Sequence, residues 1–158
     1  TTALVFIILL GAAMLTSAFR AFGGEELVKN FLQGLPGGFW AQFLIVMLVI
    51  FVLGFFLDFI EIAVVVVPIV APILLADPSA NVTAVWLGVM IGLNIQTSFL
   101  TPPFGFALFY LRGVAPPEVK TTQIYKGVIP FVIIQLIGLG ILAAFPELAT
   151  WLPDLVFG

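Results

Sequence analysis

The chain contains no cysteine and no histidine among its 158 residues. Without cysteine there is no disulfide, no thiolate metal site and no cysteine nucleophile, and without histidine the commonest general base and metal ligand is missing. These two absences remove most hydrolytic and metal-dependent enzyme classes. We therefore expect a protein that is not an enzyme and that carries no cofactor.

Charged residues are also scarce, at 8% of the chain, where a soluble domain has roughly 25%. Eight acidic and five basic residues give a net charge of -3, which offers no basic surface to a nucleic acid. Hydrophobic residues make up 63% of the chain, and the mean hydropathy is +1.31. The composition predicts an integral membrane protein whose main solvent is the lipid bilayer, with no nucleic-acid partner.

The hydrophobic residues form about five segments, which predict an all-α membrane protein made of one domain, 1–158. A helix needs about 20 apolar residues to cross a bilayer. We expect the following elements: a transmembrane helix at 3–22, an interfacial amphipathic helix at 27–35, a helical hairpin at 39–75, a helix at 84–111 that breaks near 97–103, a transmembrane helix at 124–145, and an interfacial tail at 146–158.

Two carboxylates, Asp58 and Glu61, interrupt the apolar run at 39–75. No Ser, Asn or Pro cluster there marks an exit to water, which favours a re-entrant hairpin with its tip near 54–61 over two complete crossings. A carboxylate inside a membrane is costly, so both are candidates for binding a cation, carrying a proton or accepting bonds from tip amides. The alternative for Glu61 is that it caps the second arm or snorkels to the interface.

The second arm of this hairpin has an unusual composition. Residues 64–72 are rich in valine and include Pro68 and Pro72. In water this pattern would suggest a strand, but membrane helices carry proline more often than soluble ones. We expect a kinked or partly unwound helix.

The stretch 92–105 places small polar side chains and a double proline inside an apolar segment. Proline cannot donate a backbone hydrogen bond, so the helix must break there. A broken helix presents carbonyls, which suit a hard cation, and amides, which suit an anion, as in ion-coupled secondary transporters. The alternative is that the polar residues only pack helices together. The candidate binding residues are Asn94, Gln96, Thr97, Ser98, Thr101, Pro102, Pro103 and Gly105.

Four stretches, in this order and spacing, carry a resemblance to a known family. They are LGFFLD at 53–58, IAVVVVPIVAPI at 62–73, GLNI at 92–95 and LTPPFG at 100–105. Together they resemble the C-terminal half of the large, DctM-like membrane subunit of tripartite ATP-independent periplasmic (TRAP) transporters. The resemblance runs through nearly the whole chain.

The resemblance implies an elevator-type secondary transporter built from inverted repeats. In this family Na⁺ drives the uptake of an organic anion, often a carboxylate. The Na⁺ site is implied near Gly54, Thr97 and Thr101, formed by backbone carbonyls and by the two threonine hydroxyls. The implied location is a bacterial or archaeal inner membrane, crossed several times. The implied partners are a small TRAP membrane subunit, a periplasmic solute-binding protein and the N-terminal half of the large subunit.

A full large subunit has two repeats, whereas this chain has one hairpin and one broken helix. We therefore expect a C-terminal fragment or truncated gene product, with a half-size protein that forms an antiparallel dimer as the alternative. Two other function classes stay open: a structural subunit that does not transport, and an ion channel. A channel needs a continuous polar path, whereas here the polar residues gather at one depth.

Overall fold

The structure, a computed structural model, describes residues 2–102 and 106–158. Every regular element within these ranges is a helix, and none of them is a strand. The prediction of an all-α fold is therefore confirmed for the described residues. The chain divides into two compact units, one made of Thr1–Ile50 and Leu57–Thr83 and the other of Phe51–Phe56 and Ala84–Gly158.

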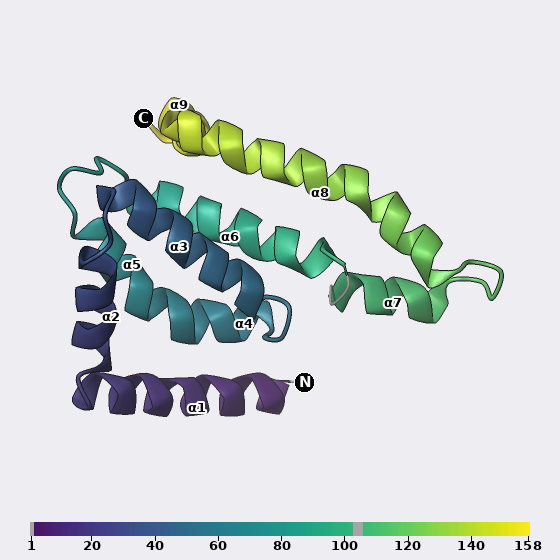
Figure 1. The fold of residues 1–158 in the computed structure, drawn as a ribbon, viewed down its shortest axis with the longest axis horizontal. Helices are drawn as coiled ribbons and strands as arrows, with labels where there is room; N and C mark the ends of the chain where they lie inside the picture. The colour runs from purple at the N-terminus through teal and green to yellow at the C-terminus, as the bar shows by residue number, and fades with distance from the viewer. Residues whose placement is uncertain (1, 103–105) are drawn as a thin grey trace. The chain divides into compact units, whose positions relative to one another are not determined.

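The first unit begins with two helices joined by a sharp turn, α1 (Thr2–Ala21) and α2 (Gly24–Gln33). Gly23 has a φ of 76°, which only glycine adopts without strain. At Gly24 a Cβ atom would lie 2.5 Å from the Phe19 ring, so a larger residue there would force that ring to move. The two glycines let α2 leave α1 at a steep angle (Figure 1).

The first unit also contains the two arms of a helical hairpin, except for Phe51–Phe56 at the end of the first arm, which group with the second unit. The first arm is α3 (Gly38–Leu53), and the second arm joins α4 (Phe59–Glu61), the π-helical turn η1 (Ile62–Val66) and α5 (Val67–Leu75). Side chains of both arms, with others from α1 and α2, line an apolar cavity of about 240 Å³. The chain therefore returns along its own path, as a hairpin requires.

A π-helical turn directly precedes Pro68 in the second arm. Proline has no N–H, so the carbonyl one turn earlier loses its usual donor. Here the helix widens just before the proline, and the Val67 N–H donates to the carbonyl of Ile62. The local unwinding expected at this proline-rich arm takes the form of one π turn.

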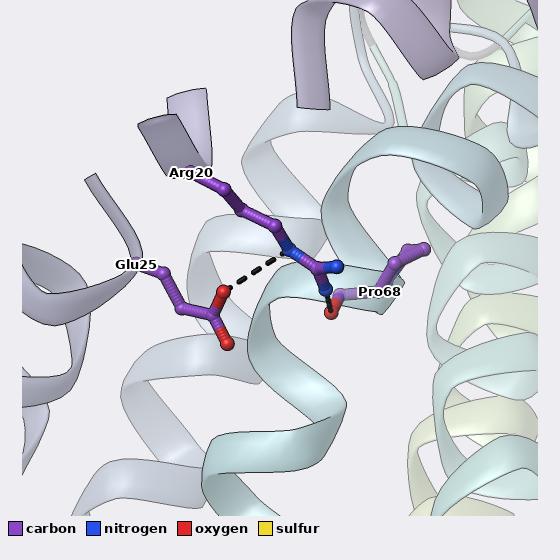
Figure 2. A network of polar contacts seen from close by, with 3 residues as sticks. All are labelled: Arg20, Glu25 and Pro68. Carbon is purple, nitrogen blue, oxygen red and sulfur yellow. Dashed lines mark hydrogen bonds and ion pairs between the residues drawn. The ribbon is translucent and has the colours of Figure 1, made fainter. Parts of the chain in front are cut away.

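Pro72 has a similar effect one turn later, because it cannot donate to the carbonyl of Pro68. The guanidinium of Arg20 reaches that carbonyl, with Nη2 3.4 Å from the oxygen, and its Nε lies 3.0 Å from the carboxylate of Glu25. Figure 2 shows the guanidinium between the two oxygen groups. Arg20 thus joins the end of α1 and the start of α2 to the second arm of the hairpin.

The second unit contains α6 (Ala84–Leu100), α7 (Phe106–Val114), α8 (Thr121–Ala144), the 3₁₀ turn η2 (Pro146–Ala149) and α9 (Trp151–Phe157). Helix α8 runs back along α7 and α6 (Figure 1). Leu108, Ile124 and Val128 form a buried cluster between α7 and α8. At the other end, the indole Nε1 of the fully buried Trp86 donates to the carbonyl of Leu142 at 2.8 Å.

Helix α8 is longer than either arm of the hairpin. Within the described residues, α8 is long and apolar enough to cross a membrane, with 24 residues. The first hairpin arm has 16 residues and is therefore about 24 Å long, which is less than the roughly 30 Å of a hydrocarbon core. This length favours a re-entrant hairpin, and re-entrance itself stays a prediction.

Candidate functional site

The break in the helix at 84–111 follows Leu100, where α6 ends, and the next described helix is α7 (Phe106–Val114). Pro102 has no N–H to donate to the carbonyl of Ser98, and the N–H of Thr101 donates to it instead at 3.2 Å. This tighter bond closes the last turn of α6. The sequence places the start of the break near Thr97, but the structure keeps Thr97 and Ser98 within the helix.

Three hydroxyl groups at the end of α6 bond to carbonyls of their own helix. Thr97 Oγ1 donates to the Leu93 carbonyl at 2.8 Å, Ser98 Oγ to Ile95 at 2.7 Å, and Thr101 Oγ1 to Thr97 at 2.7 Å. These bonds use the hydroxyl protons and explain why the helix continues through this polar stretch. Each hydroxyl oxygen keeps lone pairs with which it can accept from another group.

The candidate binding residues near the end of α6 differ in how far their side chains are buried. Thr97 and Ser98 are fully buried and Asn94 is 5% exposed, whereas Gln96 is exposed and points away from the others. Positions 94, 97, 98 and 101 lie on one helix face because they are spaced by three or four residues. Half-buried Thr101 and Pro102 lie at the end of that face, and the predicted residues Pro103 and Gly105 lie outside the described residues.

The neutral oxygens of this cluster fit a particular kind of ligand. The three hydroxyl protons are engaged within the helix, so what these oxygens offer outward is acceptor capacity alone. Carbonyl and hydroxyl oxygens suit hard cations. The C-terminal end of α6 adds the negative end of a helix dipole, so the arrangement is suited to a cation.

Gly54 is buried and directly follows α3. It belongs to the same compact unit as α6, α7 and α8, because residues 51–56 group with that unit. Asp58 and Glu61 belong to the other unit. The described residues thus place Gly54 in one unit with the polar cluster of α6, and place the two carboxylates in the unit that contains the hairpin arms.

Asp58 and Glu61 cap the second arm of the hairpin. Asp58 Oδ1 accepts from the Phe59 N–H at 2.8 Å, and Glu61 Oε2 accepts from the Asp58 N–H at 3.3 Å. The pair forms a capping box: the Asp58 side chain accepts from the first turn of α4, and the Glu61 side chain accepts from the backbone amide of Asp58. This arrangement shows two of the possibilities that the sequence offers: bonds accepted from tip amides, and a cap on the second arm by Glu61.

The sequence of this chain matches a known family. Residues 1–148 match the family described as "Tripartite ATP-independent periplasmic transporter, DctM component". The sialic acid TRAP transporter permease SiaT of Haemophilus influenzae is 38% identical over 76 residues, which is 48% of this chain and 12% of that protein. The C4-dicarboxylate TRAP transporter large permease DctM of Vibrio cholerae is 34% identical over 77 residues, 49% of this chain and 17% of that protein.

A third relative, the ectoine TRAP transporter large permease TeaC of Halomonas elongata, is 32% identical over 73 residues, 46% of this chain and 17% of that protein. These matches span less than a fifth of each relative's length. All three are bacterial proteins named as transporter permeases rather than enzymes, and they give no support to an archaeal source. No solved structure matches the chain. The chain belongs to the DctM component family of tripartite ATP-independent periplasmic transporters.

Proposed function

We propose that this chain forms part of the permease of a Na⁺-coupled transporter that takes up an organic anion by an elevator mechanism. The observation that carries the proposal is the polar end of α6, where Thr97, Ser98 and Thr101 gather beside a proline break. Discontinuous helices of this kind hold coupling ions and substrates in secondary transporters. The coupling ion is Na⁺, held near Gly54, Thr97 and Thr101.

The chemistry of the break supports both ligands of such a transporter. The end of α6 presents oxygens to a cation, while α7 begins on the far side of the break at Phe106 with the positive end of its dipole. An anionic group is stabilised at such a helix end. The coupling ion would then bind at the C-terminal end of α6, and the anionic group of the substrate would bind at the N-terminal end of α7.

The proposed substrate is a carboxylate. Sialic acid, C4-dicarboxylates and ectoine, named for the three relatives, all carry a carboxylate group. The proposed partners are a periplasmic binding protein that delivers the substrate, a small membrane subunit, and the remainder of the large subunit. The assembly would lie in the bacterial inner membrane, with a substrate site shared between the two repeats.

Uptake into proteoliposomes that contain the complete transporter and its binding protein tests this function. With a labelled carboxylate substrate, an inward Na⁺ gradient should drive accumulation, and an equal K⁺ gradient should not. Collapse of the Na⁺ gradient with a Na⁺ ionophore should abolish accumulation. Equal uptake in Na⁺ and K⁺ would contradict the proposal. Conductance that does not saturate with substrate would favour an ion channel.

A further inference from the structure

A single glutamine lies on the face of α8 that packs within its unit. The less exposed side chains of this helix recur every three or four residues, at Val128, Val132, Gln135, Leu139 and Leu142. Gln135 is the polar member of this stripe. Its Oε1 atom is buried and has no hydrogen-bond partner among the described residues. Buried polar atoms are nearly always paired, so this oxygen requires an explanation.

Two contacts set the register between α8 and α6. Trp86 Nε1 lies 2.8 Å from the carbonyl oxygen of Leu142. Further along, a Cβ atom built on Gly138 would lie 3.8 Å from Leu93 Cδ2. Moving toward the C-terminus of α6 therefore means moving toward the N-terminus of α8, and the two helices are antiparallel.

A third observation agrees with this direction. Leu100, at the end of α6, packs against the cluster of Leu108, Ile124 and Val128, whose α8 members lie near the start of α8. Gln135 lies one turn before Gly138, between that glycine and Val128. The pairs 86/142 and 93/138 therefore place Gln135 opposite residues 93–96 of α6, within about one turn of Thr97.

The oxygens of Thr97 and Gln135 are both available only as acceptors. The Thr97 hydroxyl already donates its proton to the Leu93 carbonyl, so its oxygen can only accept. The Gln135 oxygen is likewise an acceptor, and it is buried without a donor in the described part of the chain. Two neutral acceptor oxygens on facing helices, within about one turn of each other, suit a hard cation and do not suit an anion.

We propose that Gln135 supplies a side-chain oxygen to the coupling cation held at Thr97, so that α8 is part of the ion site as well as its support. This inference rests on the proposed function, because it assigns a further ligand to the same cation. A binding measurement that does not require transport separates the two.

The experiment uses the complete transporter and Na⁺ as the probe. Na⁺ replaces K⁺ step by step, so that the ionic strength stays constant. Two quantities are measured as Na⁺ is raised: the unfolding temperature in detergent, and the initial rate of substrate uptake in proteoliposomes. The variants are Gln135→Leu, which removes the oxygen at similar volume, and Gln135→Glu, which keeps it. Gln33→Leu is the control, because it makes the same change at an exposed position on α2.

In Gln135→Leu we expect the Na⁺ concentration for half-maximal effect to rise about tenfold in both measurements, as for the loss of one ligand. Without Na⁺ its unfolding temperature should not fall, since the variant removes an unpaired buried oxygen. Gln33→Leu should keep the wild-type Na⁺ concentration for half-maximal effect. Gln135→Glu should keep that concentration or lower it.

An unchanged half-maximal concentration in Gln135→Leu would overturn the inference while leaving the proposed function in place. A lower unfolding temperature without Na⁺ would also overturn it, because the oxygen would then be part of a structural bond. If Na⁺ stabilises the wild type through Gln135 but does not drive uptake, the cation site stands and the coupling fails. If Na⁺ affects neither measurement in the wild type, both proposals fail.

Discussion

Trp86 donates its indole N–H to the carbonyl oxygen of Leu142, 56 residues away, at 2.8 Å. That carbonyl lies in the last turn of α8, and the residue four positions later is Pro146, which has no N–H. Similarly, Arg20 donates to the carbonyl of Pro68, to which Pro72 cannot donate because it has no N–H. In both units a proline takes a donor from a helix and a distant side chain replaces it, so that packing contacts also satisfy the backbone.

The bond from Trp86 should contribute to the stability of the second unit. Trp86→Phe keeps an aromatic ring at this fully buried position but removes the donor, and we expect a loss of about 1–3 kcal/mol in the free energy of unfolding. Trp151→Phe is the matched control because Trp151 is 61% exposed. Unfolding of the intact permease in detergent measures both. Equal losses in the two variants would contradict the role of the indole N–H.

The bond between Arg20 and Pro68 can be tested with a double-mutant cycle. Arg20→Met should lower the free energy of unfolding by about 0.5–1.5 kcal/mol, because it removes a donor to a helix carbonyl. In a Pro72→Ala background, the new N–H of residue 72 can serve that carbonyl, and the same change should cost less. Glu25→Gln, which removes only the exposed ion pair, should cost under about 1 kcal/mol. Equal costs of Arg20→Met in both backgrounds would show that Pro68 is not its partner.

The cap at the hairpin tip predicts different effects for two changes at Asp58. Asn is a good N-cap and Ala is not, so Asp58→Ala should cost about 1 kcal/mol of stability and Asp58→Asn clearly less. Chemical unfolding of the intact permease, followed by tryptophan fluorescence, gives both values. If the two changes are equally costly, the negative charge matters more than the cap.

Asp77, in the connection between α5 and α6, predicts a dependence on pH. Its carboxylate accepts from Ser79 Oγ at 2.5 Å and from Ser79 N at 2.9 Å. These bonds hold the pKa of Asp77 below its ordinary value of 3.8. Because the folded-state pKa is the lower one, ionised Asp77 stabilises the fold above pH 3.8, and this contribution is lost as the pH falls through the folded-state pKa.

We therefore expect the unfolding temperatures of the wild type and Asp77→Asn to differ by a constant amount above about pH 5. The difference should shrink once the pH falls below 3.8. Ser79→Ala, which removes the hydroxyl donor, should reduce the same pH dependence. Parallel curves for the wild type and Asp77→Asn across the acid range would contradict the prediction.

The parts of this fold that depend on local chemistry could be predicted from the sequence. Apolar composition indicates helices in a membrane, and Pro102 and Pro103 indicate that the helix from Ala84 must end nearby. The spacing of Asp58 and Glu61 is that of a capping box. Each of these features depends on residues within one or two helical turns of one another.

The parts that depend on distant residues could not be predicted. Proline at 72 or 146 shows which carbonyl loses its donor, but nothing local to it indicates that Arg20 or Trp86 replaces the bond. The sequence predicts a break near 97–103 but not that α6 continues to Leu100, which it does because the hydroxyls of Thr97 and Ser98 bond within the helix. Gln135 becomes a candidate only through the register of α8 against α6.

The most direct measurement is the Na⁺ dependence of substrate uptake by the complete transporter with Thr101 changed. Thr101→Val keeps the shape of the side chain and removes the hydroxyl oxygen, whereas Thr101→Ser keeps the oxygen. We predict that the valine variant needs about tenfold more Na⁺ for half-maximal uptake and that the serine variant stays close to the wild type. Identical Na⁺ dependence in all three proteins would contradict the assignment of the coupling ion to the broken end of α6.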